Sequence, residues 1–341
     1  MSDIAVIGGG AWGTGIAIVL GRKGTHRVRL WAHETDVCES VNQKRVNEKF
    51  LPGRPIPDSV TASNDLSAVL DGAQIIVSVM PSQHCRGLFE RMQPLIAPPT
   101  LIVSATKGLE ESSLQRMTEV ISQVLTRDDG STPAVGALSG PSFAQEVARG
   151  DPTAITVASQ DAELLRTVQH EFSGQSFRVY TNSDVIGVEL GGALKNIVAI
   201  AAGICDGLGL GHNSVAALIT RGLAEMTRLV VACGGRAETM AGLAGLGDLV
   251  LTCTGGLSRN RSVGVELGRG RKLPDIIEAM HGMVAEGVFT TTAAVGLAHA
   301  RGVEMPITEQ MHAILHHGKP PREAIQDLMA RSGKSETSGS V

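Results

Sequence analysis

The sequence predicts an α/β protein in which a doubly wound, mostly parallel sheet is followed by an all-α carboxyl-terminal domain. Over the first 182 of the 341 residues, short apolar runs alternate with helix-length segments, and a glycine-rich turn follows the first run. After residue 182, apolar residues recur at helical spacing only. Alternating strands and helices favour a parallel sheet covered by helices on both faces. We therefore expect two domains, residues 1–182 and 183–330, and a polar, disordered tail over residues 331–341.

The expected strands are apolar runs of four to six residues, which are too short for free-standing helices and suit strands buried on both faces. They cover residues 4–7, 27–31, 74–79, 100–104, 133–138, 153–157 and 176–180. The expected helices between them cover residues 34–47, 82–95, 112–125 and 161–172. In the second domain, helix-like blocks follow at residues 190–205, 215–233, 274–281, 291–301 and 306–316.

Composition excludes several classes of protein. The 30 Lys and Arg residues against 34 Asp and Glu give a net charge of −4, which argues against a general nucleic-acid or anionic-membrane binder. The five cysteines are far apart and contain no C-x-x-C pair, so we expect neither a disulfide framework nor a metal site. The uncharged run over residues 4–21 contains six glycines and no basic flank, so we expect no signal peptide. We expect a cytoplasmic protein without integral membrane association.

The first motif with a chemical meaning is GGGAWG at residues 8–13, between an expected strand and an expected helix. In a G-x-G-x-x-G turn, Gly8 permits the tight bend, Gly10 lets the backbone approach a pyrophosphate, and Gly13 lets the helix pack closely on the strand. The amino end of the helix then offers free N–H groups to the phosphates. This context favours a Rossmann-type dinucleotide-binding domain over a glycine-rich turn of an unrelated α/β protein.

The residue that separates NAD from NADP is expected about 20 positions after the glycines, where an acidic side chain would bind the ribose 2′-hydroxyl. His33 stands at this position, so a carboxylate does not repel a 2′-phosphate there. His33 can contact that phosphate, or it can be an ordinary surface histidine at the end of a strand. The coenzyme is therefore NADP or NAD, with the choice left open.

Two polar segments follow later strands, at the sheet edge where open α/β sheets bind ligands. One contains Lys107, and the other contains Gly140 and Ser142. Ser142 with Gln145 also fits a capping box, and Lys107 taken alone is typical of a solvated surface lysine.

Lys195 lies on an expected helix face that it shares with glycines and alanines at positions 191, 192, 199 and 202. Such small neighbours would let a substrate approach the ammonium group. Burial would lower the pKa of this lysine toward neutrality, which suits proton transfer to a developing alkoxide. The alternative is again a surface lysine.

Two further segments contain polar groups near apolar ones. Asp248 follows a glycine-rich stretch in apolar surroundings, where a buried carboxylate needs a partner. Ser258, Arg259 and Asn260 open an expected helix, and a hydroxyl, a guanidinium and an amide together can receive a dianionic phosphate. A helix cap followed by solvated arginines explains the same residues.

Taken together, these segments resemble the bacterial NAD(P)-dependent glycerol-3-phosphate dehydrogenase family, in order from about Ile4 to Ala330. The matching motifs are GGGAWGT at 8–14, ATKGLE at 105–110, SGPSFA at 139–144, GGALKN at 191–196, TRGLAE at 220–225, AGLGDL at 244–249, SRNR at 258–261 and GVEMPI at 302–307. Several long motifs in matching order are far more specific than any single one.

The resemblance implies an enzyme that interconverts dihydroxyacetone phosphate and sn-glycerol 3-phosphate with NAD(P)H and so supplies phospholipid synthesis. It implies that Lys195 exchanges a proton with the C2 oxygen, that Asp248 holds Lys195 charged and oriented, and that Lys107 lies on the substrate and nicotinamide side. The implied coenzyme contacts are Gly8, Gly10, Ala11, Trp12, Gly13, His33, Lys107, Ala144, Arg259, Val284 and Glu286. The implied substrate contacts are Lys107, Gly140, Ser142, Lys195, Asn196, Asp248, Thr252, Ser258, Arg259 and Asn260. Residues 183–330 would form the substrate domain, and family precedent implies a homodimer.

Two other functions compete with this interpretation. A β-hydroxyacid dehydrogenase has the same two-domain plan and a helix lysine, but it acts on a carboxylate substrate; the pair Lys195 and Asn196 and the segment at 258–260 favour a phosphate. A non-catalytic dinucleotide sensor would need none of Lys107, Lys195 and Asp248, whose joint presence argues against it.

Overall fold

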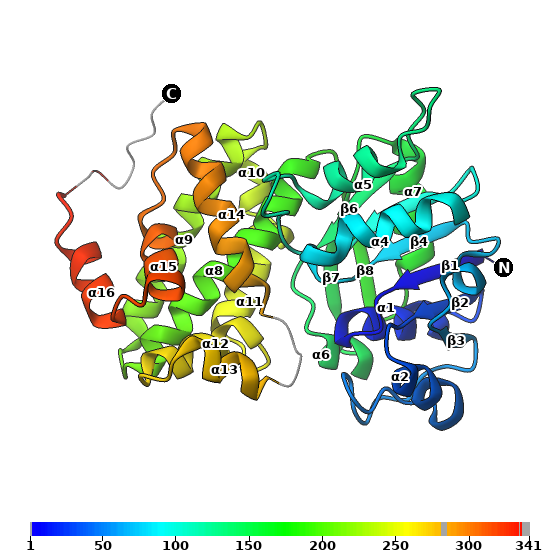
Figure 1. Ribbon diagram of the computed structural model, residues 1–341, viewed down its shortest axis with the longest axis horizontal. Helices are drawn as coiled ribbons and strands as arrows, with labels where there is room; N and C mark the ends of the chain where they lie inside the picture. The colour runs from blue at the N-terminus through cyan, green and yellow to red at the C-terminus, as the bar shows by residue number, and fades with distance from the viewer. Residues whose placement is uncertain (1, 281–284, 334, 336–341) are drawn as a thin grey trace.

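The structure, a computed structural model, describes residues 2–280, 285–333 and 335. A sheet lobe and a helical lobe lie side by side (Figure 1). The last strand ends at Asn182, and the long first helix of the second lobe begins at Val185. Most of the tail expected at residues 331–341 lies outside the described residues.

The sheet lobe contains one eight-stranded sheet in the order β3-β2-β1-β4-β5-β6-β7-β8. The strands are β1 (Ser2–Ile7), β2 (His26–Trp31), β3 (Val60–Ser63), β4 (Ile75–Ser78), β5 (Leu101–Ser104), β6 (Val135–Ser139), β7 (Thr153–Ala158) and β8 (Phe177–Asn182). Only the β6–β7 pairing is antiparallel, so the prediction of a mostly parallel sheet is confirmed.

Helices cover both faces of this sheet, as the fold class requires. They are α1 (Ala11–Arg22), α2 (Thr35–Glu39), α3 (Leu66–Leu70), α4 (Cys85–Met92), α5 (Met117–Leu125), α6 (Ala144–Arg149) and α7 (Ala162–Phe172). Alternate side chains of β1 enter different apolar clusters: Ile4 and Val6 pack on one face, and Ala5 and Ile7 on the other. Burial on both faces explains why this strand is apolar without a break.

Three expectations for the sheet lobe are corrected. The four-residue edge strand β3 was not expected, because its sequence VTAS is short and alternates instead of forming an apolar run. The helix expected over residues 34–47 is α2 followed by a π-helical turn, η1 (Ser40–Lys44). The helix expected over residues 112–125 begins only at Met117, because Leu109 and Arg116 form an antiparallel bridge just before it.

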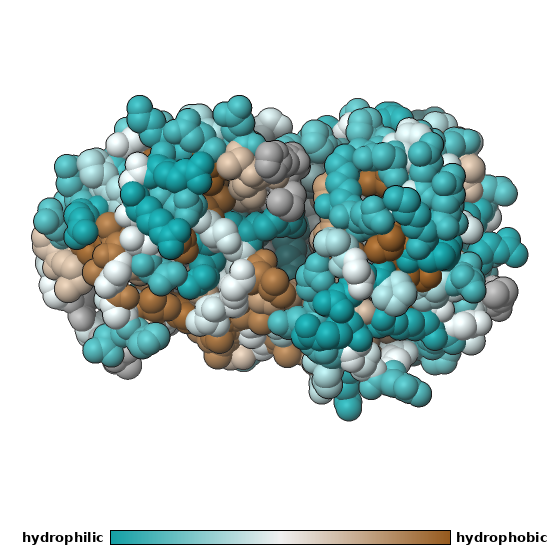
Figure 2. Space-filling model, turned by 90° about the horizontal axis from the view of Figure 1, so that it is seen from below, coloured by the Kyte–Doolittle hydropathy of each residue, from teal (hydrophilic) through white to brown (hydrophobic). Residues whose placement is uncertain are grey.

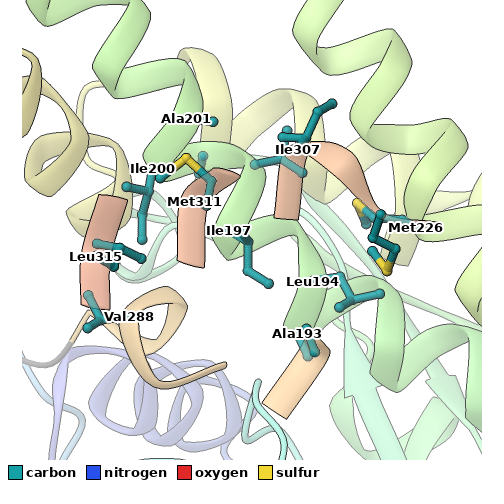
Figure 3. Packing of buried hydrophobic residues seen from close by; sticks show 14 of the residues in the cluster. Ala193, Leu194, Ile197, Ile200, Ala201, Met226, Val288, Ile307, Met311 and Leu315 are labelled. Atoms are coloured by element: carbon teal, nitrogen blue, oxygen red, sulfur yellow. The ribbon is translucent and has the colours of Figure 1, made fainter. Parts of the chain in front are cut away.

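The helical lobe is built around α8 (Val185–Gly207), whose residues from Gly187 to Cys205 are all buried. Around it lie α9 (His212–Ala232), α10 (Ala237–Met240), the π-helical turn η4 (Leu243–Gly247), α11 (Asp248–Thr254), α12 (Arg259–Gly268), α13 (Leu273–Ala279), α14 (Glu286–Arg301), α15 (Pro306–His317) and α16 (Pro321–Met329). Figure 3 shows Leu194, Ile197 and Ile200 of α8 packed among side chains of the surrounding helices, such as Met226 and Met311. This helix is long and apolar enough to cross a membrane, but 89% of its apolar window is buried inside the protein.

The reversal of direction between β6 and β7 determines which strand ends face the helical lobe. β1, β4, β5 and β6 are parallel neighbours, so their carboxyl ends meet at one edge of the sheet. Helix α8 contacts β6 and β7, and the turn η4 contacts β7. Residues that follow β5 and β6 are therefore brought against α8 and α11.

Candidate active site

The glycine-rich turn lies where the strand order reverses. The chain passes from β1 to β2 and β3 on one side and then returns to β4 on the other side of β1. Gly8 has a φ of +130°, and a Cβ on it would lie 2.6 Å from the carbonyl oxygen of Val79, just after β4. A Cβ on Gly13 would lie 1.8 Å from the carbonyl oxygen of Gly8. Both positions therefore require glycine, as the motif predicts.

The turn fits the pyrophosphate of a dinucleotide. A Cβ built on Gly10 meets no heavy atom of the described residues within 4 Å, so the backbone is open to a ligand there. Helix hydrogen bonding begins with the N–H of Thr14, which donates to Gly10, so the N–H groups of Ala11, Trp12 and Gly13 are free of helix partners. The first turn of α1 also contains no acidic residue, so its partial positive charge is available to an anion.

Two of the other expected coenzyme positions lie beside this turn or the helix that follows it. His33 is exposed two residues after β2, and its ring lies 6.2 Å from that of Trp31. Ala144 begins α6, and a Cβ on Gly15 of α1 would lie 3.6 Å from its carbonyl oxygen. Val284 lies outside the described residues.

Glu286 links the helical lobe to the segment that follows β4. It begins α14, and its carboxylate accepts hydrogen bonds from the backbone N–H of Ser82 (3.1 Å) and from its hydroxyl (2.7 Å). Burial raises the pKa of Glu286, and the bonds from Ser82 oppose that rise. Ser82 was not expected as a site residue. Its place four residues after Ser78, the last residue of β4, is the sequence signal that could have indicated it.

Three charged side chains from distant parts of the sequence meet between the lobes. Lys195 of α8 donates to one oxygen of Asp248 (Nζ to Oδ1, 2.6 Å), and Lys107, after β5, donates to the other (Nζ to Oδ2, 2.6 Å). Lys195 also donates to the hydroxyl of Thr252 (2.7 Å), and Lys107 to the carbonyl of Gly140 (3.2 Å). The Lys195 and Asp248 side chains are 8% and 1% exposed, whereas that of Lys107 is 18% exposed. One carboxylate is thus held between two ammonium groups.

The surroundings shift the pKa values of this cluster in opposite directions. Burial lowers the pKa of Lys195 to about 8; Asp248 opposes that shift, and the neighbouring Lys107 adds to it. Burial alone would raise the pKa of Asp248, but the two lysines outweigh it, so the pKa is lowered and the carboxylate is ionised. Lys195 is therefore a buried amine that can both give and take a proton near neutral pH.

Asn196 and Asn260 are joined to each other beside this cluster. The Asn260 amide donates to the Asn196 side-chain oxygen (2.9 Å), and its own oxygen accepts from the N–H of Gly287 (2.9 Å). This chain of bonds ties α8, α12 and α14 together. Both asparagines are buried, and each keeps one or more polar hydrogens for another partner.

Ser258 caps the helix that follows it, whereas Ser142 does not. Ser258 is the N-cap of α12, where its hydroxyl accepts from the N–H of Arg261 (3.2 Å), and Arg259 follows as an exposed side chain. The capping box suggested for Ser142 is wrong: its hydroxyl donates to the carbonyl of Gly140 (2.9 Å), and α6 begins after Phe143. Ser142 cannot cap that helix because it stands one residue too early.

A cavity of about 650 Å³ lies elsewhere, beside the start of β6 and the junction of β8 with α8. Its charged side chains are already paired. Asp184 accepts from the N–H groups of Gly187 and Arg236, and Arg116 pairs with buried Glu189 (2.6 Å). The lining of this cavity contains neither the two lysines nor the glycine turn. Figure 2, in which the molecule is seen from below, shows a hollow between the two lobes.

Comparisons with known proteins find the same family over both lobes of the chain. A family model described as the N-terminus of NAD-dependent glycerol-3-phosphate dehydrogenase matches residues 3–165, and the model of its C-terminus matches residues 184–326. The glycerol-3-phosphate dehydrogenase [NAD(P)+] of Koribacter versatilis is 66% identical over 336 residues, covering 98% of this chain and 99% of the relative. That of Acidobacterium capsulatum is 58% identical over 339 residues, covering 98% of this chain and all of the relative.

A solved structure gives the same result for the fold. The crystal structure of glycerol-3-phosphate dehydrogenase from Coxiella burnetii superposes with a TM-score of 0.91 at 45% sequence identity, covering 96% of this chain and 98% of that chain. Both lobes and their order are therefore shared with a solved relative. With both family models matched in order and relatives at this level of identity, the chain belongs to the NAD-dependent glycerol-3-phosphate dehydrogenase family.

Proposed function

We propose that the chain catalyses the reversible reduction of dihydroxyacetone phosphate to sn-glycerol 3-phosphate with NADPH or NADH. The observation that carries this proposal is the buried Lys107–Asp248–Lys195 cluster, which lies between the sheet edge bearing the dinucleotide turn and the helical lobe. Family membership supports the oxidoreductase chemistry and the nicotinamide coenzyme. It does not favour a β-hydroxyacid dehydrogenase or a sensor.

The residues of the dinucleotide turn would hold the coenzyme. The free N–H groups of Ala11, Trp12 and Gly13 would bind its pyrophosphate across the open backbone at Gly10. Further coenzyme contacts would come from His33, Lys107, Ala144, Arg259, Val284 and Glu286. When bound, the reduced nicotinamide supplies the hydride that is added to the ketone carbon.

Lys195 would supply the proton that balances the hydride. As the carbonyl oxygen gains negative charge, the Lys195 ammonium donates a proton to it; in the reverse direction the neutral amine removes that proton. Asp248 fixes the position of Lys195 through the 2.6 Å bond and favours its charged form. Lys107, held on the same carboxylate, places a second positive charge near the developing oxyanion.

The substrate phosphate would bind at the start of α12. Ser258 and Asn260 frame that helix end. Desolvation by burial lowers the pKa of Arg259 and the nearby Glu286 opposes that shift, and the Arg259 guanidinium can form a two-point contact with a phosphate. Gly140, Ser142, Asn196 and Thr252 would complete the substrate site. Binding the phosphate, remote from the reacting carbon, would hold the carbonyl beside Lys195.

Replacement of Arg259 tests the phosphate site. We expect Arg259→Ala to raise the KM for dihydroxyacetone phosphate by roughly tenfold to a hundredfold, since a charge-assisted hydrogen bond contributes about 1.5–3 kcal/mol. Activity on unphosphorylated dihydroxyacetone, which we expect to be low in the native protein, should not fall further when the coenzyme is saturating. Arg261→Ala is the matched control, because that arginine pairs with Asp206 (2.8 Å) at the same helix. An unchanged KM in Arg259→Ala would contradict the phosphate assignment.

The pKa of Lys195 predicts opposite pH profiles for the two directions. Reduction needs the ammonium form, so its kcat/KM should be constant below pH about 8 and fall tenfold per unit above it. Oxidation needs the neutral amine, so its kcat/KM should rise tenfold per unit up to pH about 8 and then level off. Initial rates in both directions over the same pH range provide the measurement. Because the reaction consumes a proton, the two profiles diverge tenfold per unit whichever group donates it, so the pH of the break is the test. A break far from pH about 8 in both directions would remove Lys195 from proton transfer.

Oxidation of the product distinguishes the proposed reaction from the competing ones. The protein should oxidise sn-glycerol 3-phosphate with NADP⁺ or NAD⁺ and leave a β-hydroxyacid such as 3-hydroxybutyrate unchanged. The opposite preference would identify a hydroxyacid dehydrogenase. Coenzyme binding without turnover of either compound would identify a sensor.

The cellular role and assembly follow from the same proposal. The reaction would supply glycerol 3-phosphate for phospholipid synthesis in the cytoplasm, a reducing compartment consistent with the five free cysteines. Residues 1–182 would act as the dinucleotide-binding domain and residues 183–330 as the substrate domain.

A homodimer is supported by exposed apolar side chains of the helical lobe, among them Val231, Val250 and Leu257, and by the apolar surface on that lobe (Figure 2). Light scattering, which gives the mass in solution, tests the dimer.

A further inference from the structure

The segment after η1 is fixed to the dinucleotide turn by one buried side chain. The amide of Asn47, which is 0% exposed, donates to the carbonyl oxygen of Gly9 and to the hydroxyl of Thr14, both at 2.8 Å. Its own side-chain oxygen accepts from the N–H of Phe50 (3.1 Å). Residues 47–50, which include Lys49, are therefore held against the turn.

The end of β2 lies against the same turn. A Cβ on Gly9 would lie 2.4 Å from the Cβ of Ala32, so the backbone of the turn rests on Ala32 itself. His33 and Glu34 follow directly. In this fold an acidic side chain near the end of the second strand binds the ribose hydroxyls and disfavours a 2′-phosphate. The part-buried Glu34 therefore stands, one residue after His33, where it would favour NAD.

Lys49 compensates for this carboxylate. Its Nζ lies 3.5 Å from Oε1 of Glu34 and 3.7 Å from Oδ2 of Asp36. The same Nζ lies 5.3 Å from the centre of the Phe50 ring. Both nitrogen–oxygen distances are too long for strong hydrogen bonds, so Lys49 is a shared counter-ion that is free to move to a more highly charged anion. A 2′-phosphate, with about −1.5 to −2 charges at neutral pH, is such an anion.

We propose that Lys49 determines the coenzyme preference of this chain: it neutralises Glu34 and Asp36 and, together with His33, receives the 2′-phosphate of NADP(H). The inference rests on the proposed function for the presence of a nicotinamide coenzyme, and it goes further by naming the residue that selects NADP(H) over NAD(H). Without Lys49, two uncompensated carboxylates would face the phosphate and repel it. NADH, which has no 2′-phosphate, does not use this ammonium group.

Coenzyme binding, measured without substrate, tests the proposal. Trp12, on the first turn of α1, and Trp31, at the end of β2, are the two tryptophans of the chain, so energy transfer from them to a reduced nicotinamide reports binding. In the native protein NADPH should bind more tightly than NADH. Lys49→Ala should raise the Kd of NADPH by roughly tenfold or more, as for the loss of a charge-assisted contact, and change that of NADH by less than about twofold.

Two variants serve as comparisons. Lys49→Ala combined with Glu34→Gln should recover part of the lost NADPH affinity, because the carboxylate that Lys49 had neutralised is removed as well. Lys44→Ala removes an exposed lysine that pairs with Glu48 (3.3 Å) in the same part of the chain, and it should leave the ratio of the two Kd values unchanged. Because Lys49 is 42% exposed, its replacement should not disturb folding.

An unchanged Kd ratio in Lys49→Ala, an equal change in Lys44→Ala, or tighter binding of NADH by the native protein would overturn the inference. These outcomes are distinct from failure of the proposed function. If the protein shows the predicted Kd values but does not reduce dihydroxyacetone phosphate, the proposed reaction is wrong and the role of Lys49 stands. If it reduces that substrate with an unaltered coenzyme preference in Lys49→Ala, the role of Lys49 is wrong and the reaction stands.

Discussion

Lys195→Met is expected to lower kcat for dihydroxyacetone phosphate reduction by roughly a thousandfold, within the usual range for loss of a general acid. Methionine has nearly the volume of lysine, so it can occupy the space inside α8 without a cavity, and Asp248 keeps its ion pair with Lys107. The KM for the substrate should change little, because the proton is transferred only in the transition state. Steady-state kinetics of the purified variant give both quantities.

The matched variant for this prediction is Lys107→Met. It removes the other cation from Asp248 but leaves the proton donor in place, so its loss of kcat should be clearly smaller than that of Lys195→Met. Energy transfer from the tryptophans to NADPH should show that both variants still bind coenzyme. Near-normal turnover in Lys195→Met would mean that another group, or water, donates the proton.

Asp248→Asn is expected to have the second largest effect, on stability as well as activity. It leaves two buried ammonium groups beside a neutral amide, and removing one member of a buried charge network typically costs about 3–5 kcal/mol. Because Asp248 raises the pKa of Lys195, its loss should move the fall of the reduction profile to below pH about 8. At pH about 7 we expect kcat to drop by roughly a hundredfold or more.

Thr252→Val provides the comparison for Asp248→Asn. It deletes the other hydrogen-bond partner of Lys195 without changing the charge, so it should reduce activity less and leave the pH at which reduction falls nearly unchanged. Thermal unfolding and the pH profile are measured on both variants. An unshifted profile in Asp248→Asn would mean that Asp248 supports only the structure and does not tune Lys195.

Most of the fold could be predicted because the patterns that indicate strands and turns involve residues close together in the sequence. The continuous apolar run of β1 reflects burial on both faces, and the glycine turn at 8–13 contains the residues that its backbone geometry needs. The edge strand β3 and the π-helical turn η1 were missed, because four alternating residues and one distorted turn have no distinctive pattern. For these elements the decisive contacts come from distant residues.

Lys107, Lys195 and Asp248 could each be singled out from the sequence, but their arrangement could not. Spacing on one helix indicated that Lys195 lies among small residues. Its partner Asp248, however, is 53 positions away in the sequence, and Asp248 and Lys107 are 141 positions apart. The contact between Ser82 and Glu286 joins residues 204 positions apart, so no local pattern indicates that these two side chains meet. The resemblance to a known family assigned such distant positions to one site, because members of a family share their three-dimensional arrangement.

In the proposed reaction the nicotinamide coenzyme reduces a phosphorylated ketone by hydride transfer, and the buried Lys195 donates the proton to the ketone oxygen. The most direct test follows the loss of NADPH and NADH absorbance with dihydroxyacetone phosphate and with unphosphorylated dihydroxyacetone, in the native protein and in Lys195→Met. The account predicts rapid oxidation of the coenzyme by native protein with the phosphorylated ketone only, and almost none with the variant. Coenzyme binding without turnover, or equal rates with both ketones, would contradict it.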